Sequence, residues 1–241
     1  MNYAYTTILV ALFCLNTEGG AAQSIFKAGI LAGANFSQIQ GDRQEGYRKK
    51  GLSLGLTGSM IIKPRLDICT ELLINEKGAE PTPEAGFRFN EYSSSIYLRY
   101  SEMAILAHYF FDPLADLSHY RQSVKIGFSY GRLLKSQTEI SQKLRILGDI
   151  AQTLTDNYQR NDFSFVAAWS FHFSPRFSAS LRHTTSLNFI YTSTPTIAKE
   201  AFENMRPYFI SAHLAYTFIS PKQMVVIKQK IKNKKDPLEE L

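Results

Sequence analysis

The segment from Phe163 to Ser174, FSFVAAWSFHFS, limits the possible folds more than any other part of the sequence. Side chains along a β-strand point alternately to opposite faces. One face here is apolar and mostly aromatic: Phe163, Phe165, Ala167, Trp169, Phe171 and Phe173. The other face is small or polar: Ser164, Val166, Ala168, Ser170, His172 and Ser174. It lacks the Lys and Glu of a solvent-facing strand, so the segment fits a membrane barrel whose aromatic side faces lipid.

The same alternation recurs in the rest of the chain and predicts eight strands. Besides the first segment, the pattern covers residues 26–37, 52–62, 66–75, 94–111, 124–131, 177–184 and 208–218. The alternation is weakest in the fourth strand, where we expect a β-bulge between Arg99 and Ser101. An insertion from 136 to 161 has apolar residues at helical spacing, and residues 192–206 contain a helix-start pattern.

The prolines predict where the strands end. An apolar residue, a spacer and then proline occur at Pro64, Pro113, Pro175 and Pro221, after every second strand. Proline cannot donate a hydrogen bond to a neighbouring strand, so it ends the pairing. The long polar connections all lie at the opposite ends of the strands. Short periplasmic turns and long extracellular loops are typical of bacterial outer-membrane barrels.

The sequence therefore predicts an all-β fold, an eight-stranded antiparallel transmembrane β-barrel in the outer membrane, with both termini periplasmic. We expect a signal peptide over residues 1–22, because the apolar run Ile8 to Leu15 precedes small residues. The alternative for this segment is a buried strand. The barrel is expected over 23–220 and a Lys-rich tail over 221–241. Signal cleavage would leave Cys69 alone, so no intrachain disulfide is expected.

Three further segments resemble the PorT-like outer-membrane barrels of Bacteroidetes. They are Ala32 to Asp42 with the following Gly46-Tyr47 and Gly51, then Glu71 to Gly78, and Tyr100 to Leu106. Ser101 and Ala104 depart from the family pattern, in which Leu and Pro are usual. The resemblance spans about Lys27 to Phe218. It implies a barrel fold and a role in the type IX secretion and gliding machinery.

The barrel interior is expected to hold a polar network. Eight strands leave a lumen that side chains just fill, which excludes a general diffusion pore. The inward-facing charged residues are Glu71, Glu102, Lys125 and Arg182. We interpret them as a structural network, because buried charges need partners. The alternative is a gated path for a small solute.

An enzyme is the minor alternative, as some eight-stranded outer-membrane barrels modify lipids. His172 and Ser174 come closest to a base and nucleophile, but no acid is placed to orient the imidazole. The five histidines are scattered: His108, His119, His172, His183 and His213. This spacing predicts no metal site, and we expect no cofactor. The net charge of +6 could suggest nucleic acid, which an exported barrel does not meet.

The sequence thus predicts a non-enzymatic outer-membrane barrel that scaffolds protein secretion, with membrane lipid and other secretion proteins as partners. The alternative is a stand-alone structural or adhesion barrel. The tail has five lysines that could dock a partner: Lys228, Lys230, Lys232, Lys234 and Lys235. It could equally be a solvated periplasmic segment.

Overall fold

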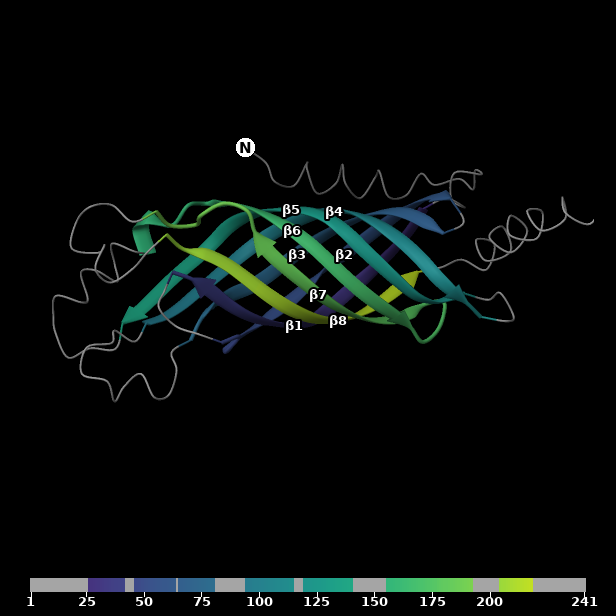
Figure 1. The fold of residues 1–241 in the computed structure, drawn as a ribbon, viewed down its shortest axis with the longest axis horizontal. Coiled ribbons are helices and arrows are strands. Elements are labelled where there is room, and N and C mark those ends of the chain that lie inside the picture. The colour runs from purple at the N-terminus through teal and green to yellow at the C-terminus, as the bar shows by residue number, and fades with distance from the viewer. Residues whose placement is uncertain are drawn as a thin grey trace, which may run out of the picture.

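The computed structural model describes residues 26–41, 46–63, 65–80, 94–114, 119–140, 155–192 and 204–218. Within these ranges, antiparallel strands form one closed barrel in which β8 pairs with β1 (Figure 1). The strands are β1 (Phe26–Gln40), β2 (Lys49–Lys63), β3 (Leu66–Ala79), β4 (Ser94–Pro113), β5 (Tyr120–Ile140), β6 (Asn161–His172), β7 (Phe177–Ser186) and β8 (Arg206–Phe218). The predicted fold class is confirmed.

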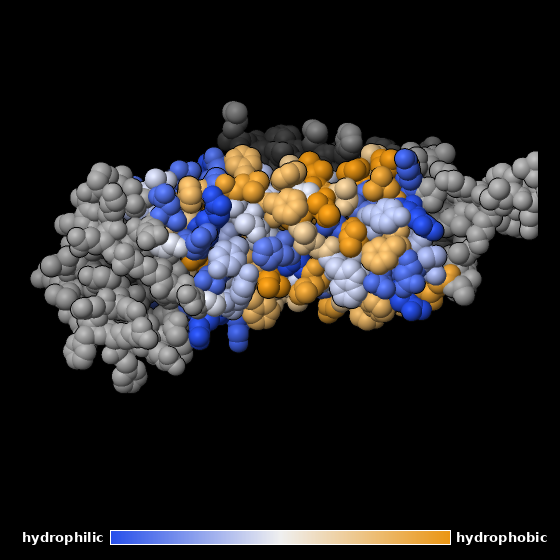
Figure 2. Space-filling view, viewed as in Figure 1, coloured by the Kyte–Doolittle hydropathy of each residue, from blue (hydrophilic) through white to orange (hydrophobic). Residues whose placement is uncertain are grey.

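The two faces of the strands also agree with the prediction. Outward side chains are apolar and open, with Phe128 62% and Leu214 67% exposed, while inward neighbours such as Ser129 and His213 are buried. In Figure 2 the apolar side chains gather around the middle of the barrel, and hydrophilic ones lie toward its two ends. A closed barrel pairs its backbone groups internally, so this apolar belt can face lipid without an unsatisfied sheet edge.

The connections differ in length at the two ends of the barrel, as predicted. The strand ends that flank residues 64–65, 114–119 and 173–176 lie at one end, here called the turn end. The strand ends that flank residues 41–48, 80–93, 141–160 and 187–205 lie at the other, the loop end. β1 begins and β8 ends at the turn end (Figure 1).

The strands reach further toward the loop end than predicted. β5 continues to Ile140, so the connection after it begins at 141 rather than 136. The side chains of Lys135, Gln137 and Glu139 are polar and exposed. This part of β5 therefore lacks the outward apolar residues from which the other strands were predicted. Residues 155–157 are helical, while the rest of the predicted helix, at 141–154, lies outside the described residues, as does most of the helix signal at 192–206.

The β-bulge was predicted at the correct position, but it lies in β5 and not in β4. The pairing of β4 with β5 shifts between Arg99 and Tyr100, and the additional residue is Leu134 of β5. β4 itself alternates without a break, with Leu98, Tyr100 and Glu102 all inward and buried. The alternation of polar and apolar residues is weak in this part of β4 because its inward side chains near the loop end are also apolar.

The predicted signal peptide (1–22) and Lys-rich tail (221–241) lie outside the described residues. No helix within the described ranges is both long enough and apolar enough to cross a membrane.

Candidate functional site

The loop-end half of the interior is filled with packed apolar side chains. They come from β1, β3, β4 and β5 and from the segments on either side of β6 and β7: Ile39, Ala79, Ile96, Leu98, Tyr100, Tyr158, Ile190, Tyr191 and Met205, with Leu133 packed against them. We call this group the loop-end plug. These residues are almost fully buried, so within the described ranges they pack the loop-end part of the lumen.

A buried cation lies directly against the plug. The Lys77 Nζ lies 2.8 Å from Glu102 Oε1 and 2.5 Å from Asp162 Oδ2, and its side chain is 0% exposed. The ammonium also sits 4.1 Å from the centre of the Tyr100 ring, a cation–π distance. Asn75 donates a further hydrogen bond to Glu102, at 2.7 Å. We call Lys77, Glu102 and Asp162 the Lys77 cluster; one cation against two carboxylates gives it a formal charge of −1.

A second buried cluster lies nearer the turn end. Lys125 Nζ donates to Glu71 Oε1 at 2.8 Å, and Arg182 Nη2 donates to Glu71 Oε2. Lys125 and Arg182 are both register partners of Ala168 on β6, whose small side chain leaves them room to reach one carboxylate. We call these three charged residues the Glu71 cluster, and its formal charge is +1.

The structure thus divides the interior residues predicted from the sequence. It brings Glu71, Lys125 and Arg182 together, and it places Glu102 in the other cluster. Lys77 and Asp162 were not among the predicted interior residues. Both have the parity of inward residues, so extending the third predicted strand by two residues and the sixth by one would have found them.

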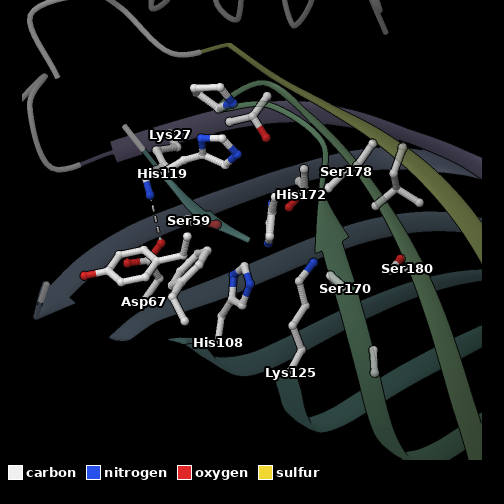
Figure 3. Close-up of a pocket in the computed structure, with 18 of the residues that line it drawn as sticks. Lys27, Ser59, Asp67, His108, His119, Lys125, Ser170, His172, Ser178 and Ser180 are labelled. Atoms are coloured by element: carbon white, nitrogen blue, oxygen red, sulfur yellow. Dashed lines mark hydrogen bonds and ion pairs between the residues drawn. The ribbon is translucent and has the colours of Figure 1, made fainter. Parts of the chain in front are cut away.

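The turn-end half of the interior contains a cavity of about 200 Å³. Figure 3 shows His108, His172 and Lys125 directed into this space, and the ion pair of Lys27 with Asp67 at 3.1 Å lies beside it. The cavity extends from the Glu71 cluster to turn residues such as Pro175. We call it the turn-side cavity.

The histidines in the cavity do not form the base and nucleophile considered from the sequence. His172 Nε2 hydrogen-bonds Ser123 Oγ at 2.8 Å, and His108 Nε2 hydrogen-bonds the same hydroxyl at 2.8 Å. Ser174 instead accepts backbone N–H groups of the turn, from Arg176 and Phe177. Ser123 is buried, and its hydroxyl is shared between the two imidazoles.

The remaining histidines lie elsewhere on the cavity wall or on the outer face. His213 hydrogen-bonds Ser53 at 2.9 Å, His119 lies at the turn end of the cavity, and His183 is exposed on the outer face. Within the described ranges, no three His, Cys, Asp or Glu side chains are grouped to hold a metal ion. Cys69 is a buried free thiol, 3.3 Å from the Thr57 hydroxyl.

A polar rim lies above the apolar belt on the outer face near the loop end. The Tyr97 hydroxyl donates to Glu76 at 2.6 Å, and Arg99 donates to the same carboxylate at 2.7 Å. The Tyr97 hydrogen bond and the Arg99 guanidinium lower the pKa of the Glu76 carboxyl. Charged groups on the outer face of a barrel are unfavourable in lipid, so we expect the outer surface to leave the lipid near these residues.

A closed strand order, an apolar outer belt and a charged interior together define a transmembrane β-barrel of the outer-membrane type. No family model and no curated protein matches the chain. Among solved structures, it is similar to Ail of Yersinia pestis, with 10% identity over 80% of this chain and 99% of that one, at a TM-score of 0.43. Neisserial surface protein A shares 13% identity over 83% of this chain and 100% of that one, at a TM-score of 0.40.

OprG from Pseudomonas aeruginosa is similar at 8% identity, covering 81% of this chain and 95% of that one, at a TM-score of 0.40. At such low sequence identity, the similarity is limited to the arrangement of the strands. The barrel class therefore rests on this chain's own belt and interior.

Proposed function

We propose that this protein is a non-enzymatic outer-membrane barrel that serves protein secretion as an accessory or scaffold component, in the manner of the PorT-like barrels. Two features support a scaffold role. The loop-end plug and the Lys77 cluster fill the loop-end half of the lumen, so we expect no cargo to pass through the barrel itself. Contacts with partner proteins are then expected at its ends.

The observation that carries this proposal is an extension of the sheet at the loop end. β4 has 20 residues and β5 has 21, whereas β7 has 10. A strand crosses a membrane with about 9–11 residues, so the longer strands project beyond it. Past the pairing of Arg132 with Asn161, β5 pairs with β4 alone. We call residues 76–79, 94–100 and 133–140 the β3–β5 extension.

The extension is well suited to hold a partner protein. Its inner side packs on the loop-end plug, through Ile96, Leu98 and Tyr100, so its backbone is held in place. Its outer side presents Lys135, Gln137 and Glu139 to solvent. A supported surface loses little conformational freedom on binding, which favours a stable complex.

The proposed orientation puts the loop end outside the cell and the turn end in the periplasm. Lipid then surrounds the apolar belt, and a tail over 221–241, with Lys228 to Lys235, follows the last strand on the periplasmic side. Secretion partners could therefore be contacted from either end.

A deletion strain tests the secretion role. We expect loss of surface delivery of secreted cargo, restored by the full chain and not by a chain with Lys135→Glu, Gln137→Lys and Glu139→Lys on the extension. Lys50→Glu, an exposed change outside the extension, serves as the matched control. A heat-modifiable gel shift establishes that each variant forms its barrel. Normal cargo delivery without the protein would rule the proposal out.

A stand-alone structural or adhesion barrel is the second candidate, and the exposed extension is compatible with it. In that case deletion alters envelope integrity or surface binding and leaves secretion intact. A chain that stops at residue 220 distinguishes a function of the tail from a function of the loop end. If the shortened barrel still inserts, only a function carried by the tail is lost.

A further inference from the structure

The turn-side cavity has an excess of positive charge. Its charged side chains are Lys27, Lys63, Lys125, Arg182, Asp67 and Glu71. Asp67 is paired with Lys27, and Glu71 is shared between Lys125 and Arg182. One cation more than the carboxylate can balance therefore lies at the inner end of the cavity, beside Ala168.

Negative charge elsewhere in the barrel does not reach this place. The Lys77 cluster has the opposite formal charge, but Asp162 and Glu102 both bind Lys77 within the loop-end half. Lys125 and Arg182 both contact Glu71, but a single carboxylate leaves the cluster with a net charge of +1, and net charge inside a barrel is unfavourable. An anion in the cavity would balance this charge.

Hydrogen-bond donors surround the same space. Lys125 and Arg182 each retain N–H groups after donating to Glu71. The Ser170 hydroxyl borders the cavity, is 2% exposed, and has no hydrogen-bond partner in the structure. Buried hydroxyls are nearly always paired. Ser180, the register partner of Ser170 on β7, borders the cavity as well.

We propose that the turn-side cavity binds a small anion bearing a phosphate group, held by Lys125, Arg182 and Ser170. The donors come from three strands and outnumber those that the two oxygens of a carboxylate can accept, whereas a tetrahedral phosphate matches them. The side chains on this wall are small, as at Ala168, Ser178 and Ala215, and the cavity of about 200 Å³ has room for such a group. This site does not depend on the secretion role.

The phosphate could belong to a free solute or to the headgroup of a lipid in the surrounding leaflet. The test is calorimetric titration of the purified full chain, folded in a phosphate-free detergent, with glycerol 3-phosphate and with dihexanoyl phosphatidic acid. Sodium chloride is kept constant throughout. Saturable binding of one equivalent is expected. Clearly tighter binding of the lipid assigns the headgroup as the source, and equal binding assigns the free solute.

Variants locate the binding site. We expect Ser170→Ala to weaken binding about fivefold, since one hydrogen bond to the anion is lost. Arg182→Met should weaken it by about tenfold or more, because a charged donor is lost. Ser164→Ala, on the same face of the same strand but bordering the Lys77 cluster, should bind like the unaltered chain. The heat-modifiable gel shift establishes folding in each case.

Absence of saturable binding to both ligands would overturn the site, as would equal affinities of the Ser170→Ala and Ser164→Ala chains. If Arg182→Met does not fold, the comparison of Ser170→Ala with Ser164→Ala still tests the site. The Ser170 hydroxyl has no partner in the structure, so its removal leaves the barrel's own hydrogen bonds intact. Cargo delivery is measured separately, so failure here does not bear on the secretion proposal.

Discussion

Lys77 joins two buried carboxylates in the closed half of the interior. It is fully buried and is the only described cation within 4 Å of either Glu102 or Asp162. Lys77→Met keeps much of the side-chain volume but leaves two carboxylates without a cation. Breaking a buried pair in this way costs roughly 3–5 kcal/mol. We expect that loss in the free energy of unfolding, measured by urea titration in lipid vesicles.

Two comparisons define the origin of this loss. Lys50→Met, at an exposed position near the loop end, should change the free energy of unfolding by less than about 0.5 kcal/mol. A chain that combines Lys77→Met with Glu102→Gln and Asp162→Asn has no unpaired charge and should be more stable than Lys77→Met alone. Equal stability of the two would mean that packing around Lys77, rather than its charge, matters.

Trp169 reports which side of a strand meets lipid. It is the single tryptophan of the chain, points outward from β6 and is 46% exposed, with its indole N–H donated to Gln122 at 3.2 Å. We predict strong quenching of its fluorescence in vesicles of brominated lipid and weak quenching by aqueous iodide. Efficient iodide quenching in the folded barrel would contradict the assignment of this face to lipid.

Closure of the barrel depends on the contact between the first and last strands. Gly33 of β1 faces β8 so closely that an added Cβ would lie 2.1 Å from the carbonyl oxygen of Ala212. Gly33→Ala should therefore cost about 1–3 kcal/mol, because β1 and β8 must separate locally. Gly58→Ala is the matched control, since its Cβ would meet nothing within 4 Å.

The two glycine variants are compared by folding yield and by heat-modifiable mobility. We expect a lower yield of folded barrel for Gly33→Ala and an unchanged yield for Gly58→Ala. If both variants fold alike, the close approach of β1 and β8 is not essential for closure.

At the level of the strands, alternation was enough to predict eight elements and the face of each, because lipid and interior impose opposite polarity on successive residues. It failed where lipid is absent. Residues 133–140 and the apolar Leu98 and Tyr100 lie in the β3–β5 extension. Most outward residues there are polar, Leu134 excepted, and inward ones form a core. The charged clusters could not be predicted in the same way, because they depend on the register between strands. Lys125 and Arg182 meet because both pair with Ala168, and the alternation within one strand does not reveal its register with the next.

The molecule as a whole combines a filled half and a hollow half. Its loop end is closed by the plug and the Lys77 cluster, while the turn-side cavity holds the Glu71 cluster at its inner end. This asymmetry bears on function: within the described residues, a solute in the turn-side cavity would meet the Lys77 cluster and the plug before it reached the loop end. A barrel packed in this way is expected to bind rather than to conduct.

Electrical recording tests that closure. We predict that the purified protein in planar lipid bilayers gives no steady conductance, since the plug leaves no continuous water path through the described interior. Tyr100→Ala removes a fully buried ring that lies 4.1 Å from the Lys77 ammonium, so brief openings should appear in that variant. Voltage-dependent openings of the unaltered chain would instead favour a gated solute path, with Lys77 and its two carboxylates as the barrier that moves.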